Sequence, residues 1–92
     1  MAIEIRLSNT FRRRYKERIS GNSTLVGEFK AALSQFTADR TVDGLHDHQL
    51  NDAMQHYRAF AINADYRVIY RWKEPNQAVF LDIGTHEDVY RR

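Results

Sequence analysis

Hydrophobic and polar residues alternate at the start of the chain. Ile3, Ile5 and Leu7 are separated by Glu4 and Arg6, and this period of two predicts a half-buried β-strand. The polar run 8–10 that follows offers side-chain oxygens able to cap a helix. We therefore expect a strand within residues 1–7 and a helix that begins directly after it.

The spacing then becomes helical. Phe11, Tyr15 and Ile19 recur every four residues, which places them on one side of a helix. A polar stretch, 20–23, interrupts the pattern and supplies the next cap. Apolar residues resume at the same spacing at Leu25, Val26, Phe29, Leu33 and Phe36. The pattern predicts two antiparallel helices joined by a short turn.

The second half of the chain predicts strands. Residues 39–51 are mostly polar and are expected to form a loop. Three strand-like runs follow, Tyr57–Ile62, Tyr66–Trp72 and Gln77–Ile83, with turns at 63–65 and 73–76. The order β-α-α-β-β-β predicts one α+β domain over residues 1–92, in which the helical hairpin covers one face of an antiparallel sheet.

A register follows if the two turns pair Ile62 with Tyr66 and Trp72 with Gln77. The predicted core face then carries Phe60, Ile62, Tyr66, Val68, Tyr70, Trp72, Val79, Leu81 and Ile83. The opposite face carries Tyr57, Ala59, Ala61, Arg67, Ile69, Arg71, Ala78, Phe80 and Asp82. Small residues beside arginines predict a shallow, positively charged surface with no helix over it.

Composition narrows the classes of protein to consider. The 92 residues include no cysteine, which excludes disulfides, cysteine-based zinc sites and thiol catalysis. With no signal-peptide pattern and no apolar run of about 18 residues, we expect a cytoplasmic protein without a membrane span. Lys and Arg number 14 against 12 Asp and Glu, a net charge of +2, which permits a nucleic-acid partner without requiring one.

Histidines are the first candidates for chemistry, at positions 46, 48, 56 and 86. His46 and His48 lie two residues apart, on one side of an extended segment. Together with His86 they are compatible with a three-ligand zinc site, although no metal motif supports it. The alternative is that they are solvated loop histidines.

Arginine within a strand is the second candidate. Arg67 stands where strand propensity favours an apolar residue or Thr. A guanidinium held on a sheet can bind a phosphate through two parallel hydrogen bonds. The predicted register also sets Arg67 opposite Asp82, and an ion pair there is worth about 0.2–1 kcal/mol. Arg58 and Arg71 raise the same question.

Two further segments carry candidate residues. His86 follows Gly84, which we expect to end the last strand, and an imidazole exchanges protons near neutral pH. Tyr90 lies four residues later, on the same side if the tail is helical. Arg13 and Arg14 belong to the basic outer side of the first helix, which is either solvated or bound to the phosphate backbone of a large RNA.

Taken together, the motifs of residues 46–90 resemble the RelE/ParE toxin superfamily, most closely the YafQ-like mRNA interferases. The motifs are Asp47-His48-Gln49-Leu50, Tyr57-Arg58, Asp65-Tyr66-Arg67-Val68-Ile69-Tyr70 and Gly84-Thr85-His86 with Tyr90. The order of the predicted elements is also that of the family. The resemblance implies a type II toxin–antitoxin toxin that cuts mRNA on the ribosome without a metal or other cofactor.

The same resemblance implies roles for individual residues. His86 would donate a proton to the leaving oxygen, and His48 would serve the other proton transfer. Asp65 would orient or assist a base, and Arg67 would stabilise the phosphate. Tyr90 would stack on a base or assist proton transfer, and Tyr66 would stack on a base. The remaining RNA-binding candidates are Arg58, Arg71, Arg13 and Arg14.

This chain departs from the YafQ pattern at two positions. YafQ-like chains carry a histidine near the position of Ala61 and an arginine near the position of Asp82, and this chain has neither. We expect Arg67 to supply the positive charge of the missing arginine. The implied partners are the ribosome with its mRNA and an acidic antitoxin of the RelB/DinJ kind, in a heterodimer or heterotetramer. The alternatives are a ParE-like toxin acting on DNA gyrase or another protein, and a small module that binds metal through His46, His48 and His86.

Overall fold

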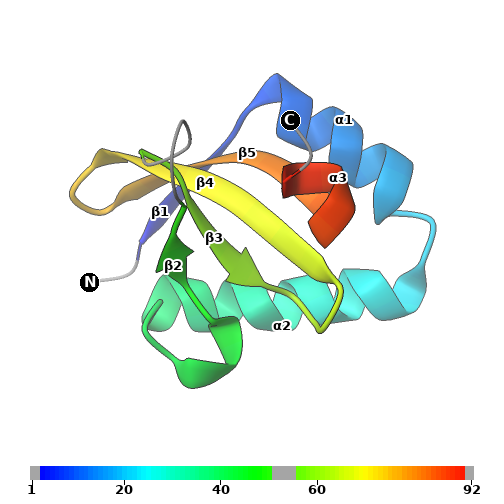
Figure 1. Cartoon of the computed structure of the whole chain (residues 1–92), viewed down its shortest axis with the longest axis horizontal. Coiled ribbons are helices and arrows are strands. Elements are labelled where there is room, and N and C mark those ends of the chain that lie inside the picture. The colour runs from blue at the N-terminus through cyan, green and yellow to red at the C-terminus, as the bar shows by residue number, and fades with distance from the viewer. Residues whose placement is uncertain (1–2, 51–55, 91–92) are drawn as a thin grey trace.

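A computed structural model describes residues 3–50 and 56–90, and of Tyr90 the backbone alone. Within these ranges the chain forms five strands, three α-helices and one short 3-10 helix (Figure 1). In chain order the elements are β1 (Glu4–Leu7), α1 (Asn9–Arg18), α2 (Ser23–Ala38), η1 (Asp43–Leu45), β2 (His48–Gln49), β3 (Arg58–Ala61), β4 (Tyr66–Glu74), β5 (Gln77–Thr85) and α3 (His86–Tyr90).

The strands form one sheet in the order β1-β5-β4-β3-β2. β1 pairs in parallel with the first half of β5, and the other neighbours are antiparallel. The predicted α+β class and element order are confirmed, with additions. The predicted loop over 39–51 contains η1 and β2, and the tail after the last strand forms α3. Both strand β2 and helix α3 are shorter than the windows in which periodicity can be read.

The helix boundaries follow the predicted capping residues. The Ser8 hydroxyl accepts a hydrogen bond from the Phe11 N–H at 3.0 Å, and the Asn22 side chain accepts one from the Leu25 N–H at 3.1 Å. Each cap satisfies a backbone donor that the first helical turn leaves without a partner.

Aromatic rings form the centre of the core, between the sheet and α2. The fully buried Phe36 ring lies 4.6 Å from that of Phe60, 4.9 Å from Tyr70 and 5.7 Å from Phe80, measured between centroids. Phe11 connects α1 to the same cluster through Phe80, at 5.4 Å. These contacts hold both helices on one face of the sheet.

The predicted register is correct for β3–β4 and wrong for β4–β5. The Ile62 N–H donates to the Tyr66 carbonyl as expected. In the next hairpin, however, the turn shortens to residues 75–76, and Trp72 pairs with Ala78 rather than Gln77. A bulge then follows, because Tyr70 pairs with Phe80 and Ile69 with Asp82. A first shift in register, between Trp72 and Glu74, turns Ala78 and Phe80 toward the core, and the bulge restores the alternation so that Ile83 faces the core as well.

Four residues exchange faces as a result. Ala78 and Phe80 are fully buried in the core, whereas Val79 and Leu81, which were predicted there, are only partly buried. The predicted pairing of Arg67 with Asp82 is also wrong, since Arg67 lies opposite Gly84.

The second face of the sheet was predicted to have no helix over it, and this prediction is wrong for part of the face. Helix α3 packs against it, and the fully buried Val89 contacts a small apolar cluster formed with Leu50, Ala59 and Ile69. The five-residue helix thus provides this face with a core of its own. The predicted positively charged surface can therefore occupy only the part of this face that α3 does not cover.

A buried carboxylate attaches the segment before β2 to the sheet. The Asp47 side chain is 2% exposed, and it accepts hydrogen bonds from Arg58 Nη2 at 2.6 Å and Nε at 2.8 Å. Arg40 Nη1 approaches at 3.2 Å, and the Tyr70 hydroxyl donates to the second oxygen. His46 has a φ of 50°, and this left-handed conformation turns the chain so that Asp47 points inward.

The same contacts shift the pKa values of Tyr70 and Arg58. Burial raises the pKa of Tyr70, and the hydrogen bond to Asp47 raises it further. For Arg58, burial alone lowers the pKa, but the bonds to Asp47 and Tyr70 outweigh burial and raise it. Both groups therefore keep their protons, and with them their hydrogen bonds to Asp47, throughout the physiological range.

Replacing Asp47 with Asn should destabilise the protein. The neutral side chain cannot accept from two guanidinium groups and a hydroxyl, so we expect a loss of about 1.5–3 kcal/mol in the free energy of unfolding. Urea unfolding measures the difference. The control is Asp43→Asn in η1, an exposed position, with an expected change within about 0.5 kcal/mol. Equal stabilities of the two variants would show that the network contributes nothing.

Candidate functional site

Three of the predicted site residues, Asp65, Tyr66 and His86, lie where β5 passes into α3. The Thr85 hydroxyl accepts from the Asp88 N–H at 3.2 Å, and the Asp88 carboxylate accepts from the Thr85 N–H at 3.1 Å. This reciprocal pair is a capping box. It starts the helix at His86 and so fixes the backbone that carries the imidazole.

Arg18 of α1 fixes the same corner from the side. Its Nη1 donates to the Ile83 carbonyl at 2.8 Å and lies 3.5 Å from the Asp82 carboxylate, and its Nε lies 3.9 Å from Asp88. The Thr85 N–H, followed by the Thr85 hydroxyl and the charges of Arg18 and Arg14, lowers the pKa of Asp88. Asp88 is therefore ionised at neutral pH and holds its capping bonds there.

Gly84 is required by this packing. A Cβ at Gly84 would lie 2.6 Å from Arg18 Nη1 and 2.8 Å from the Asp88 Cβ. The arginine end can move aside, but the Asp88 Cβ is fixed by the helix. Only glycine permits α3 to sit this close to β5.

Asp65 and His86 lie side by side. The His86 N–H donates to the Asp65 carbonyl at 3.1 Å, so the turn before β4 is attached to the first residue of α3. A surface hollow of about 410 Å³ lies here, lined by residues 64–66 and 85–87. Asp65 and His86 are exposed, while Tyr66 is half-buried against the main core and borders the hollow. A ligand in this hollow would meet the carboxylates of Asp65 and Glu87, the imidazole of His86 and the ring edge of Tyr66.

Arg67 follows Tyr66 on β4 and so lies next to this hollow. It lies between Ala61 on β3 and Gly84 on β5 in the paired strands, and these small residues leave room around its side chain. Its Nη1 donates to the carbonyls of Asn63 at 2.8 Å and Tyr66 at 3.1 Å. Within the described residues its Nε and Nη2 make no hydrogen bond, so they are available to an anion.

His48 is carried by the opposite edge strand, β2. It pairs with Ala59, which contacts the apolar cluster under Val89, so the strand of His48 and helix α3 flank one patch of the sheet. The His48 Nδ1 lies 2.8 Å from the His46 carbonyl oxygen. A carbonyl only accepts, so Nδ1 is the donor in this contact, and Nε2 is the nitrogen of the exposed ring that this contact leaves unused.

The remaining candidates are not gathered at the hollow. Arg58 is bound to Asp47 and Tyr70. Arg71 is exposed, on the same side of β4 as Arg67. Arg13 is exposed on α1, whereas Arg14 is half-buried, and its Nε is buried without a hydrogen-bond partner in the described structure. The side chain of Tyr90 lies outside the described residues.

Two other expectations concern metals and membranes. Across residues 3–50 and 56–90, no group of three or more His, Asp or Glu side chains has the arrangement of a metal site. The set of His46, His48 and His86 considered as an alternative is therefore not among such groups in these ranges. No helix in these ranges is long and apolar enough to span a membrane.

Sequence reasoning missed three features of the site. The Asp47 network links residues distant in the sequence, and no local pattern signals it. The Arg18 contacts depend on how α1 packs against β5. By contrast, Thr85 and Asp88 have the spacing of a capping box, and this signal predicts a helix that begins at His86.

Comparison with known proteins identifies the family. A family model for YafQ, a bacterial toxin of type II toxin–antitoxin systems, matches residues 3–91. The chain belongs to the YafQ toxin family. It is therefore a type II toxin–antitoxin toxin, as its motifs predicted. Among curated protein sequences, none matches this YafQ-family chain significantly.

Solved structures agree on the fold of this YafQ-family toxin. YafQ from E. coli strain BL21(DE3) is 18% identical, with 96% of this chain and 98% of that chain covered and a TM-score of 0.79. The E. coli DinJ–YafQ toxin–antitoxin complex matches at 17% identity, 98% and 99% coverage and a TM-score of 0.76. A YoeB/ParE toxin from Agrobacterium tumefaciens matches at 13% identity, 91% and 99% coverage and a TM-score of 0.75.

The two departures from the YafQ pattern occupy defined places. Ala61 is buried directly opposite Arg67. Asp82 is 3% exposed, accepts from the Ile83 N–H at 2.8 Å and lies beside Arg18. The Asp82 carboxylate is thus a packed structural group with a guanidinium from α1 next to it, and its charge is directed at that guanidinium.

Gly84→Ala should displace α3. Because the Asp88 Cβ cannot yield without moving the helix, we expect a loss of about 1–3 kcal/mol in stability and altered amide chemical shifts over residues 85–89. The control is Gly27→Ala, in α2 with open space around it, which should stabilise the fold by about 0.5–1 kcal/mol. Unchanged shifts at His86 in the Gly84 variant would contradict the packing argument.

Proposed function

We propose that this YafQ-family toxin is a ribosome-dependent endoribonuclease that cuts mRNA without a metal ion. The observation that carries the proposal is the meeting of His86, Asp65 and Arg67 at the β5–α3 corner. The ribose 2′-oxygen attacks the neighbouring phosphorus, the bond to the 5′-oxygen breaks, and a 2′,3′-cyclic phosphate and a 5′-hydroxyl remain. The reaction needs a base, an acid and positive charge on the phosphorane.

His48 and His86 divide the two proton transfers. The acceptor Nε2 of His48 suits a base that takes the 2′-hydroxyl proton, because its Nδ1 is held by the His46 carbonyl. His86, at the start of α3, gives a proton to the leaving 5′-oxygen. Asp65 is attached through its carbonyl to the His86 N–H and orients the corner. Rate enhancement by such positioned groups is typically about 10²–10⁴-fold for each transfer.

Arg67 stabilises the charge that develops on phosphate. Its Nη1 is held by two backbone carbonyls, and its Nε and Nη2 make no hydrogen bond within the described residues. A rigid pair of donors suits bidentate binding of phosphate oxygens. Tyr66 and Tyr90 supply stacking surfaces for bases, and Arg71 adds charge on the path of the RNA.

Two macromolecular partners belong to the proposal. The ribosome presents the mRNA, and the exposed Arg13 of α1 contributes to that contact through its charge, with Arg14 beside it in sequence but half-buried. The second partner is a small acidic antitoxin of the RelB/DinJ kind, bound as a heterodimer or heterotetramer. The E. coli DinJ–YafQ complex, with the same fold, supports that partner.

His86→Ala should abolish cleavage while leaving the fold intact. Removal of the acid raises the barrier for departure of the 5′-oxygen, so we expect the rate to fall by about 10²-fold or more. Primer extension on translating ribosomes measures the in-frame cuts. The matched control is His56→Ala, an exposed histidine outside the corner, which should cut like the unmodified protein. Equal cleavage by both variants would remove His86 from the mechanism.

Arg67→Ala should lower the cleavage rate far more than it lowers stability. Loss of a donor aimed at the developing charge costs about 10²–10³-fold in rate. Single-turnover cleavage on ribosome complexes measures this step, and thermal unfolding measures the fold. Arg71→Ala, on the same side of the same strand, is the comparison and should weaken RNA binding without this loss of rate. If the Arg67→Ala variant cuts at the unmodified rate, Arg67 has only a structural role, that of binding the carbonyls of the turn before β4.

A further inference from the structure

Asn63 is the first residue of the turn that joins β3 to β4, and it is half-buried. Its side-chain oxygen accepts hydrogen bonds from two backbone N–H groups, those of Asp65 and Tyr66, each at 2.8 Å. Its own carbonyl accepts from Arg67 Nη1, also at 2.8 Å. Asn63 therefore bonds directly to three consecutive residues that have roles in the proposed chemistry.

The orientation of the Asn63 amide is determined by what surrounds it. The two backbone N–H groups of the turn meet one end of the amide and need an acceptor there. A carboxylate oxygen, Glu28 Oε1 of α2, lies 3.1 Å from the other end and needs a donor. Only the orientation with Oδ1 toward the turn and Nδ2 toward α2 satisfies both ends. The amide thus joins the turn to α2 with both of its polar groups.

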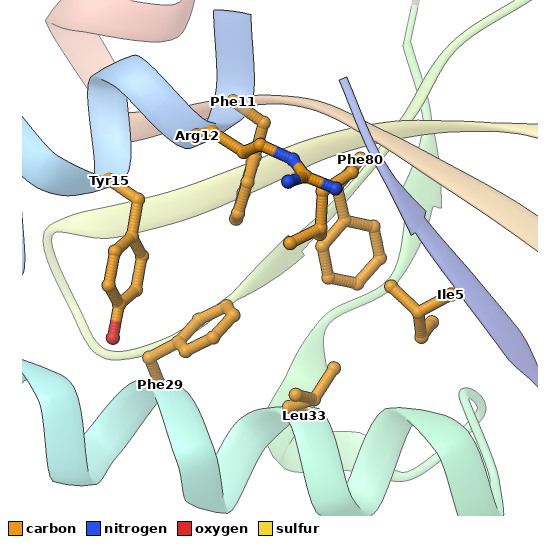
Figure 2. Close-up of a pocket in the computed structure, with 8 residues that line it drawn as sticks. Ile5, Phe11, Arg12, Tyr15, Phe29, Leu33 and Phe80 are labelled. Carbon is orange, nitrogen blue, oxygen red and sulfur yellow. The ribbon is translucent and has the colours of Figure 1, made fainter. Parts of the chain in front are cut away.

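Helix α2 is a firm support for this bond. The buried ring of Phe29, the residue after Glu28, lies 5.2 Å from Tyr15 and 6.1 Å from Phe11, between centroids. Figure 2 shows Phe29 and Leu33 extending from α2 into an apolar groove of about 460 Å³ that is also lined by residues of α1 and β1. Because aromatic rings pack this part of α2 in place, Glu28 holds the turn against a helix that resists displacement.

Of the groups attached to the turn, the guanidinium of Arg67 depends on it most. Its Nη1 bonds to the carbonyls of Asn63 and Tyr66, and within the described residues these are the hydrogen bonds that hold it. The His86 N–H also bonds to the turn, at the Asp65 carbonyl, but α3 has its own capping box to hold it. A change in the shape of the turn should therefore displace the guanidinium first.

We propose that Asn63 is a positioning residue for the cleavage reaction and that it acts through Arg67. It contributes no group to the reaction itself. Its side chain folds the turn and ties it to Glu28, and the folded turn presents the two carbonyls that orient the guanidinium toward phosphate. This inference rests on the nuclease proposed above and names a residue on which the geometry of that site depends.

Single-turnover cleavage on ribosome complexes tests the kinetic part. For Asn63→Ala we expect the rate at saturating toxin to fall about 10–10²-fold, while the toxin concentration that gives half of this rate stays within about twofold. The matched control is Asn22→Ala. Its side-chain oxygen makes the same kind of bond, with the Leu25 N–H at the start of α2, and its loss should leave the cleavage rate unchanged. Equal rates for the two variants would overturn the proposal.

A second comparison identifies the group through which Asn63 acts. In a toxin that already carries Arg67→Ala, adding Asn63→Ala should lower the rate by less than about twofold, because the group that Asn63 positions is absent. If the two substitutions instead lower the rate independently, so that their effects multiply, the action through Arg67 is overturned.

Exchanging donor and acceptor tests the link to α2. Asn63→Asp alone keeps the oxygen that accepts from the turn but sets a second carboxylate against Glu28, so the rate should fall. Adding Glu28→Gln supplies an amide that can donate to the new carboxylate, and the rate should recover. A double variant no faster than Asn63→Asp would remove Glu28 from the proposal.

NMR gives a readout that requires no cleavage. In the unmodified toxin the Arg67 Nε–H should be ordered on the ps–ns timescale, whereas that of the exposed Arg71 should be mobile. Asn63→Ala should make the Arg67 signal as mobile as that of Arg71, and Asn22→Ala should not. An Arg67 signal unaffected by the loss of Asn63 would overturn the proposal even in an active nuclease. If no form of the toxin cuts mRNA, the nuclease proposal fails, and the NMR comparison still decides whether Asn63 positions Arg67.

Discussion

The pairing of β4 with β5 is the interaction on which the rest of the molecule depends. It begins at a two-residue turn, passes through a bulge and ends with Tyr66 beside Thr85. A shift in register near the turn directs Phe80 into the core, and the bulge returns Ile83 to the same face, so both halves of the long strand contribute to the core. The last pairs set Arg67 opposite Gly84 and bring Asp65 next to His86. The pairing of β4 with β5 therefore positions both the core and the candidate site.

Local patterns were sufficient to predict much of this fold. The strand before Ser8, the two capped helices and the first hairpin follow from alternation, helical spacing and side-chain oxygens placed at helix starts. The register of the last hairpin did not follow, because a bulge depends on whether Phe80 or Val79 fits better beneath α1 and α2, and that is decided by tertiary packing. Asp47 was read as part of a motif, and its burial depends on residues from three separate segments.

The site was predicted in part for the same reason. His86, Asp65 and Arg67 lie close together because hairpin geometry and a glycine bring them there, and a sequence motif reflects such short-range constraints. Arg58 shows the opposite case. From its position on a strand it was equally suited to bind RNA or an acidic residue, and the structure shows it held by Asp47 and Tyr70. Charge alone does not distinguish a structural arginine from a functional one.

Helix α1 has a consequence for how the sheet meets other chains. β1 pairs only with the first half of β5, and beyond it Ser8 and Arg18 of α1 bond to the backbone carbonyls of Leu81 and Ile83. The second half of β5 is thus covered along its side by a helix that carries five positive charges. An uncovered strand edge can recruit strands of other chains. The toxin's own helix therefore shields this edge whether or not an antitoxin is bound.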